Sequence, residues 1–165
     1  APAVPADPAA PAQAPDANTN LAPPPRPLGT LRVAEAQAEE RQAFTEARRA
    51  LREEGLAAGV EAFAAFERRY PNSPLRGESA VLLGNAFFEQ GRFTEAARQY
   101  LIGARDFPDS PVAPDSQLGL GQALLRMGRP GDACGAFLDI PRRFPAADPG
   151  VLERARQAAI DAGCS

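Results

Sequence analysis

The sequence Tyr-Pro-Asn-Ser-Pro at residues 70–74 recurs as Phe-Pro-Asp-Ser-Pro at residues 107–111, 37 residues later. A looser copy, Phe-Pro-Ala-Ala-Asp, follows at residues 144–148 after the same interval. A chain that repeats with a period of about 20 to 50 residues is built from similar supersecondary units, each burying its apolar face against its neighbours. Such arrays present extended surfaces to other proteins. The repeat therefore favours an interaction module over an enzyme.

Residues that favour helices fill the intervals between these turns. Proline is absent from residue 31 to residue 70, where Ala, Glu, Arg, Gln and Leu dominate, and all five are good helix formers. No strand pattern competes, so the predicted fold class is all-α. We predict helices at about 33–53, 57–69, 76–90, 93–106, 114–127, 130–143 and 149–162. They form three helix pairs in repeats of about 38–74, 75–111 and 112–148, followed by a C-terminal capping helix at about 149–162.

The N-terminal segment differs in composition from the rest. Residues 1–29 hold nine of the eighteen prolines, together with many alanines. Because proline lacks a backbone N–H and fixes φ, neither a helix nor a sheet is expected there. We predict a disordered Pro/Ala-rich linker at 1–30 and a repeat domain at 31–165. The linker serves either as a spacer or as a docking motif around residues 23–27. The chain begins with Ala1 rather than Met, which we interpret as a processed chain or a fragment.

Charge and composition argue against several classes of function. The net charge is −3, which offers no basic surface for nucleic acid. No apolar run reaches the roughly 20 residues that span a bilayer. Histidine is absent and there are two cysteines, so the commonest general base is missing and a structural zinc site lacks its usual four ligands. We predict no catalytic residue, no metal, no cofactor, no nucleic-acid partner and no membrane insertion.

The two cysteines predict a disulfide. Cys134 lies near the start of one predicted helix, and Cys164 lies at the end of the next. If the two helices pack antiparallel across the turn at 145–149, the start of one lies beside the end of the other. The alternative is two free thiols in a reducing compartment.

The second and third repeats resemble tetratricopeptide repeats. Leu83, Gly84, Phe87, Ala96, Tyr100, Gly103 and Pro108 fall at that motif's spacings, and Gly121, Ala133, Phe137 and Pro145 follow 37 residues after their counterparts. The resemblance implies a right-handed superhelix in which the first helix of each pair lines a concave groove. Small residues at Gly84 and Ala96 are expected where two helices cross, and Phe87 and Tyr100 are expected to fill the space between units.

Carried over to this sequence, that pattern makes the groove from helix positions in each of the three repeats: Arg41, Phe44, Arg48, Leu51 and Arg52, then Glu78, Val81, Asn85, Phe88 and Glu89, and then Asp115, Leu118, Gln122, Leu125 and Arg126. From these, the predicted partner-binding residues are Arg48, Asn85, Phe88, Glu89, Leu118, Gln122 and Arg126. Phe88 either faces the partner or packs under the neighbouring unit. Asn85 either hydrogen-bonds the partner's backbone or is solvated.

A narrower resemblance covers roughly residues 27–165. The Tyr/Phe-Pro-Asn/Asp-Ser-Pro turns, Leu-Gly-Asn-Ala-Phe at 83–87 and Gly-Arg-Phe-Thr-Glu-Ala-Ala at 91–97 resemble the C-terminal domain of the Tol-Pal accessory family called YbgF or CpoB. This implies a periplasmic scaffold that binds TolA and coordinates outer-membrane constriction with septal peptidoglycan synthesis through a penicillin-binding protein. Members of the family oligomerise through an N-terminal coiled coil that is absent from this sequence. The alternatives are a subunit of outer-membrane assembly or lipoprotein transport, and a docking module of a larger enzyme.

Overall fold

A computed structural model describes residues 28–164, with side chains from Glu35 onwards. The predicted linker therefore lies almost entirely outside the described residues, and the first helix begins three residues before the predicted domain boundary of 31. The described part contains seven helices and no strand, which confirms the all-α superhelix. Their bounds are α1 Leu28–Glu53, α2 Leu56–Arg69, α3 Arg76–Glu89, α4 Phe93–Arg105, α5 Ala113–Arg126, α6 Pro130–Arg143 and α7 Pro149–Asp161.

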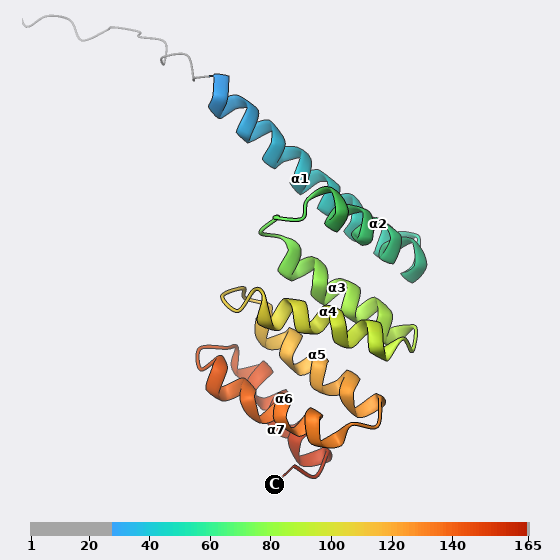
Figure 1. The fold of residues 1–165 in the computed structure, drawn as a ribbon, viewed down its shortest axis with the longest axis vertical. Helices are drawn as coiled ribbons and strands as arrows, with labels where there is room; N and C mark the ends of the chain where they lie inside the picture. The colour runs from blue at the N-terminus through green and yellow to red at the C-terminus, as the bar shows by residue number, and fades with distance from the viewer. Residues whose placement is uncertain (1–27, 165) are drawn as a thin grey trace, which may run out of the picture.

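The helices stack in chain order. Each helix packs against the next, while α5 also contacts α3 and α7 (Figure 1). The N-terminal part of α1 projects beyond the stack in Figure 1. The repeating contacts make α1, α3 and α5 the first helices of three pairs, and α7 takes the place of a fourth first helix.

Two glycines set the turns inside the second and third pairs. Gly91 has φ of 74° and Gly128 has φ of 72°, and this left-handed conformation ends a helix at little cost only when the residue has no Cβ. The amides of Arg92 and Arg129 then donate back to the carbonyls of Phe87 and Leu124, over 2.8 Å and 2.9 Å.

The turns between pairs explain why their sequence recurs. Ser73 is buried, its hydroxyl accepts a hydrogen bond from the Leu75 amide over 3.0 Å, and it donates to the carboxylate of Glu40 on α1. Ser110 accepts from the Val112 amide in the same way, over 3.5 Å. A serine that bonds the backbone two residues ahead fixes such a turn locally. In the third copy Asp148 does this at the start of α7, accepting from Gly150 over 2.8 Å.

Small residues let the helices of one pair approach closely, as predicted. A Cβ on Gly84 would lie 2.6 Å from the Tyr100 ring, and a Cβ on Gly121 would overlap the Phe137 ring. Ala96 and Ala133 have no exposed surface. Tyr100 also lies against Gly119 of the next first helix, so one aromatic ring holds α3, α4 and α5 together.

The core consists of two clusters of buried side chains. One contains Phe44, Phe63, Phe66, Phe87 and Tyr100, and the other contains the C-terminal side chains Leu118, Phe137, Ile140, Phe144 and Ala155. Leu120 packs against both clusters. The array is therefore continuous from the first pair to the capping helix.

The capping helix α7 buries a narrow stripe. Val151, Ala155 and Ala159 are buried and Leu152 is half-buried, but Ile160 is 62% exposed. A disulfide joins Cys134 of α6 to Cys164 just after α7, with their Cα atoms 5.4 Å apart. The predicted pairing is confirmed.

Candidate protein-binding groove

The predicted groove lies on the first helices α1, α3 and α5. Arg48 of α1 forms an ion pair with Glu78 of α3 over 3.4 Å, and Asp115 of α5 forms one with Arg154 of α7 over 2.8 Å. All four side chains are at least a third exposed, so these bridges contribute little stability. They show, however, that groove positions on neighbouring first helices lie side by side.

Most of the predicted partner-binding residues are exposed on this surface, and the structure corrects two groove positions. Leu118 is 4% exposed in the C-terminal cluster, which also contains Ala155 and Ala159 of α7. It is covered because α7 packs on α5 as a further first helix would. Phe44 is 5% exposed and meets Phe63 and Phe66 at ring centroid distances of 5.6 Å and 5.4 Å. The exposed members are Arg48, Asn85, Glu89, Gln122 and Arg126.

A hydrogen bond from Tyr100 holds the side chain of Asn85. The Tyr100 hydroxyl donates to Asn85 Oδ1 over 2.7 Å. Burial raises the pKa of Tyr100 to about 12, and the negative charge of Glu89 acts in the same direction, so the hydroxyl stays protonated and keeps donating at neutral pH. With its oxygen engaged, Asn85 has its amide N–H groups left for a partner carbonyl.

Phe88 belongs to an aromatic cluster at one end of the groove. It is half-buried, and its ring meets Phe93 of α4 edge-on with centroids 5.2 Å apart. The guanidinium carbon of Arg126 lies 4.3 Å from the Phe93 centroid and 5.7 Å from that of Phe88. Phe88 is thus covered in part by Phe93 of its own helix pair and by Arg126 of the next unit, and the rest of its surface is open to solvent.

Phe88→Ala is expected to weaken partner binding more than it weakens folding, because half-buried aromatic side chains often dominate interface energy. The measurement is the affinity for a captured partner beside the thermal midpoint of the same variant. Phe87→Ala is the matched control, since Phe87 is 9% exposed in the core and should lose stability first. A large loss of stability with unchanged affinity for Phe88→Ala would contradict the prediction.

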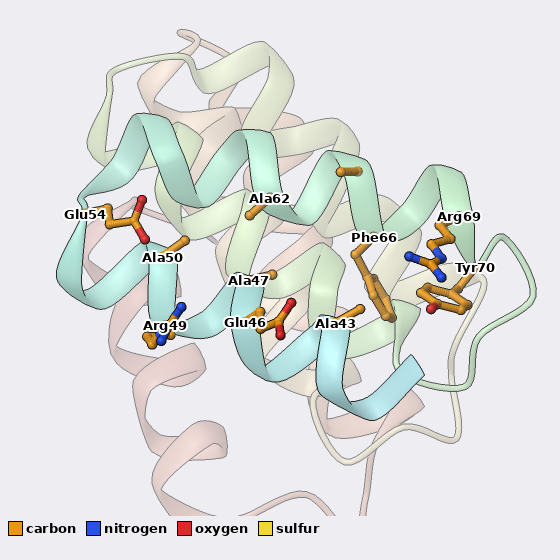
Figure 2. Close-up of a pocket in the computed structure, with 11 residues that line it drawn as sticks. Ala43, Glu46, Ala47, Arg49, Ala50, Glu54, Ala62, Phe66, Arg69 and Tyr70 are labelled. Carbon is orange, nitrogen blue, oxygen red and sulfur yellow. The ribbon is translucent and has the colours of Figure 1, made fainter. Parts of the chain in front are cut away.

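A separate hollow lies between α1 and α2, with a volume of about 340 Å³. Figure 2 shows Phe66 and Tyr70 at one end, Glu54 at the other, and alanines between them. Arg49 on its wall takes the position of the buried Ala86 and Ala123, which lie 37 and 74 residues later. In the second and third repeats that position is buried, whereas here it is charged and exposed. The hollow thus lies on the first helix pair and is lined mainly by alanines and aromatic rings, with charged side chains among them.

A family model described as tetratricopeptide repeat matches residues 44–111 and again residues 81–148. The two matches start 37 residues apart and each spans two repeats, so they cover the three repeats in register. The chain belongs to the tetratricopeptide repeat family. No curated protein matches the chain.

Tetratricopeptide repeats form protein-interaction modules, and the fold is typically a non-catalytic scaffold. A protein partner is therefore the expected ligand of the groove. Among the described residues, no helix is long and apolar enough to cross a membrane. Residues 28–164 also contain no group of three or more His, Cys, Asp or Glu side chains that could hold a metal ion.

Sequence reasoning missed Phe93 and the anchoring of Asn85 by Tyr100. Phe93 begins a second helix, and the tetratricopeptide pattern assigns the groove to first helices. The structure places Phe93 beside the groove because Arg126, 33 residues later, lies across its ring. The signal in the sequence was the neighbouring pair Phe87 and Phe88, which one helix cannot bury on a single face.

Proposed function

We propose that this tetratricopeptide domain is a periplasmic scaffold of the Tol-Pal system. In this role it binds TolA and coordinates constriction of the outer membrane with septal peptidoglycan synthesis during cell division. Two features support the proposal: the turns and the glycine-containing phrases that resemble the YbgF or CpoB family, and the protein-interaction fold on which they lie.

The disulfide between Cys134 and Cys164 is the observation that supports a periplasmic location. Structural disulfides persist in oxidising compartments and are rare in the bacterial cytosol. The bond joins the capping helix to the last repeat, where it has a structural purpose. It therefore favours an envelope protein over a cytosolic one.

The groove supports a partner held as a segment across α1, α3 and α5. Asn85 and Gln122 offer amide groups there, and Arg48, Glu89 and Arg126 offer exposed charges. Exposed polar groups around a few half-buried aromatic rings are typical of non-obligate interfaces. Such an interface suits a scaffold that joins and releases TolA and a peptidoglycan synthase.

Binding of the 165-residue chain to the soluble periplasmic part of TolA is the direct test. We expect saturable binding with micromolar affinity, about −8 kcal/mol, which weakens in Asn85→Ala and not in Arg68→Ala, a control on α2 outside the groove. Capture from envelope extract gives a second readout. Absence of TolA binding, with recovery of outer-membrane assembly proteins or of a catalytic chain instead, would overturn the proposal and favour one of those alternatives.

A further inference from the structure

The exposed charges of the groove are unevenly paired. Glu78 and Asp115 are bound by Arg48 and Arg154. Three groove arginines form no ion pair within residues 28–164: Arg41, Arg52 and Arg126. Among the groove acids, only Glu89 likewise forms no ion pair within these residues. Unpaired positive charge therefore prevails on this face, although the whole chain carries −3.

Arg126 differs from Arg41 and Arg52 because its guanidinium lies against aromatic rings. Its guanidinium lies 4.3 Å from the centre of the Phe93 ring and also within cation–π distance of Phe88. The residue is exposed, and no hydrogen bond to its N–H groups occurs within the described residues. A planar donor held against aromatic rings loses little freedom when it binds a carboxylate.

The repeat itself shows that this arrangement is not needed to hold neighbouring units together. At the junction between the first two repeats, the matching positions are Leu51, Leu56 and Glu89. At the junction with the capping helix they are Leu125, Pro130 and Gly163. Both junctions close without an aromatic pair or an arginine. The cluster of Phe88, Phe93 and Arg126 is thus a local addition to the second junction.

We propose that Arg126, Phe88 and Phe93 form an anchor that selects an acidic residue beside an apolar one in the partner segment. The partner carboxylate accepts hydrogen bonds from the Arg126 guanidinium, and the neighbouring apolar side chain packs on the open parts of the two rings. This inference rests on the proposed function in that the groove binds a protein segment. It adds the chemistry by which that segment is recognised.

The test uses an array of short peptides in a Gly/Ser background whose two central residues run through all pairs of amino acids. The labelled 165-residue chain is expected to bind the peptides in which Asp or Glu stands beside Leu, Ile, Phe or Tyr. The best peptide is then titrated in solution against Arg126→Gln, and we expect a loss of affinity of about tenfold. Arg126→Lys should show a smaller loss of affinity than Arg126→Gln, because a lysine keeps the charge without the planar fork. Arg98→Gln, exposed on α4, is the matched control and should bind as the unmodified chain does.

Two results would overturn the anchor. One is an array without preference for acidic pairs, and the other is equal affinity of Arg126→Gln and the unmodified chain for the best acidic peptide. Because Arg126 is exposed, its variants should keep the thermal midpoint, and Phe93→Leu gives a second probe that keeps apolar volume while removing the ring. TolA binding without any acidic preference would leave the proposed function standing and refute the anchor. An acidic preference that needs Arg126, without TolA binding, would support the anchor and refute the proposed function.

Discussion

Phe137→Ala is expected to lower the free energy of unfolding by about 3–5 kcal/mol. The Phe137 ring is 1% exposed and lies so close to Gly121 that a Cβ there would overlap it. It belongs to the cluster that joins α5, α6 and α7. Removing the ring leaves a cavity that this cluster cannot close, because the glycine opposite has no side chain to move into it.

Urea denaturation of the variant, followed by helical circular dichroism, measures the effect. Leu138→Ala on the same helix is the matched control, since Leu138 is 47% exposed and should cost much less. Similar losses for the two variants would show that Phe137 does not support the core as described. Tyr100→Phe offers a finer comparison, because it keeps the ring and removes only the hydroxyl that Asn85 accepts from.

The helices and their order could be predicted because their signals are local. Gly91 and Gly128 end helices through their own backbone conformation, and Ser73 fixes its turn through a bond to the amide two residues ahead. Small residues at Gly84 and Gly121 mark the close crossings in the same local way. The repeat multiplied each signal, so that an ambiguous copy could be read from a clearer one.

Burial within the groove could not be predicted in the same way. The repeat assigned Leu118 and Phe44 to the groove by position, but whether a position is covered depends on which helix lies next to it in space. Leu118 is covered because α7 continues the row of first helices. Phe44 is covered because its ring turns toward Phe63 and Phe66.

The contact of Arg126 with Phe93 has a similar origin. It joins a second helix to the first helix of the next unit, across 33 residues of sequence. In the other junctions, leucine or proline takes the position of Phe93, and glutamate or glycine takes that of Arg126, so the repeat could not supply the missing information. Recognition features of a repeat protein are expected at such departures from its own period, since the period itself encodes packing.

The double variant Cys134→Ser, Cys164→Ser is expected to lower the free energy of unfolding by about 3–4 kcal/mol. The disulfide closes a loop with a sequence separation of 30, and restricting a loop of that size in the unfolded chain gives a stabilisation of this magnitude in the chain-entropy model. The capping helix depends on it because its buried side chains are mostly small. Val151, Ala155 and Ala159 cover the last apolar face, while Glu153, Arg156 and Asp161 face solvent.

Loss of the bond should act first on α7, since among the described residues that helix packs mainly on α5 and α6. Hydrogen exchange is expected to rise over residues 149–161 before it rises in α3 and α4, and the unmodified chain in reductant should match the double variant in urea denaturation. Non-reducing mass spectrometry should find the native chain two hydrogens lighter than the dithiol, as one disulfide requires. Two free thiols in protein from an oxidising compartment, or equal stability with and without the bond, would remove both the clamp on α7 and its support for a periplasmic location. A uniform loss of protection across all repeats would instead mean that the array unfolds as one unit and that α7 does not fray by itself.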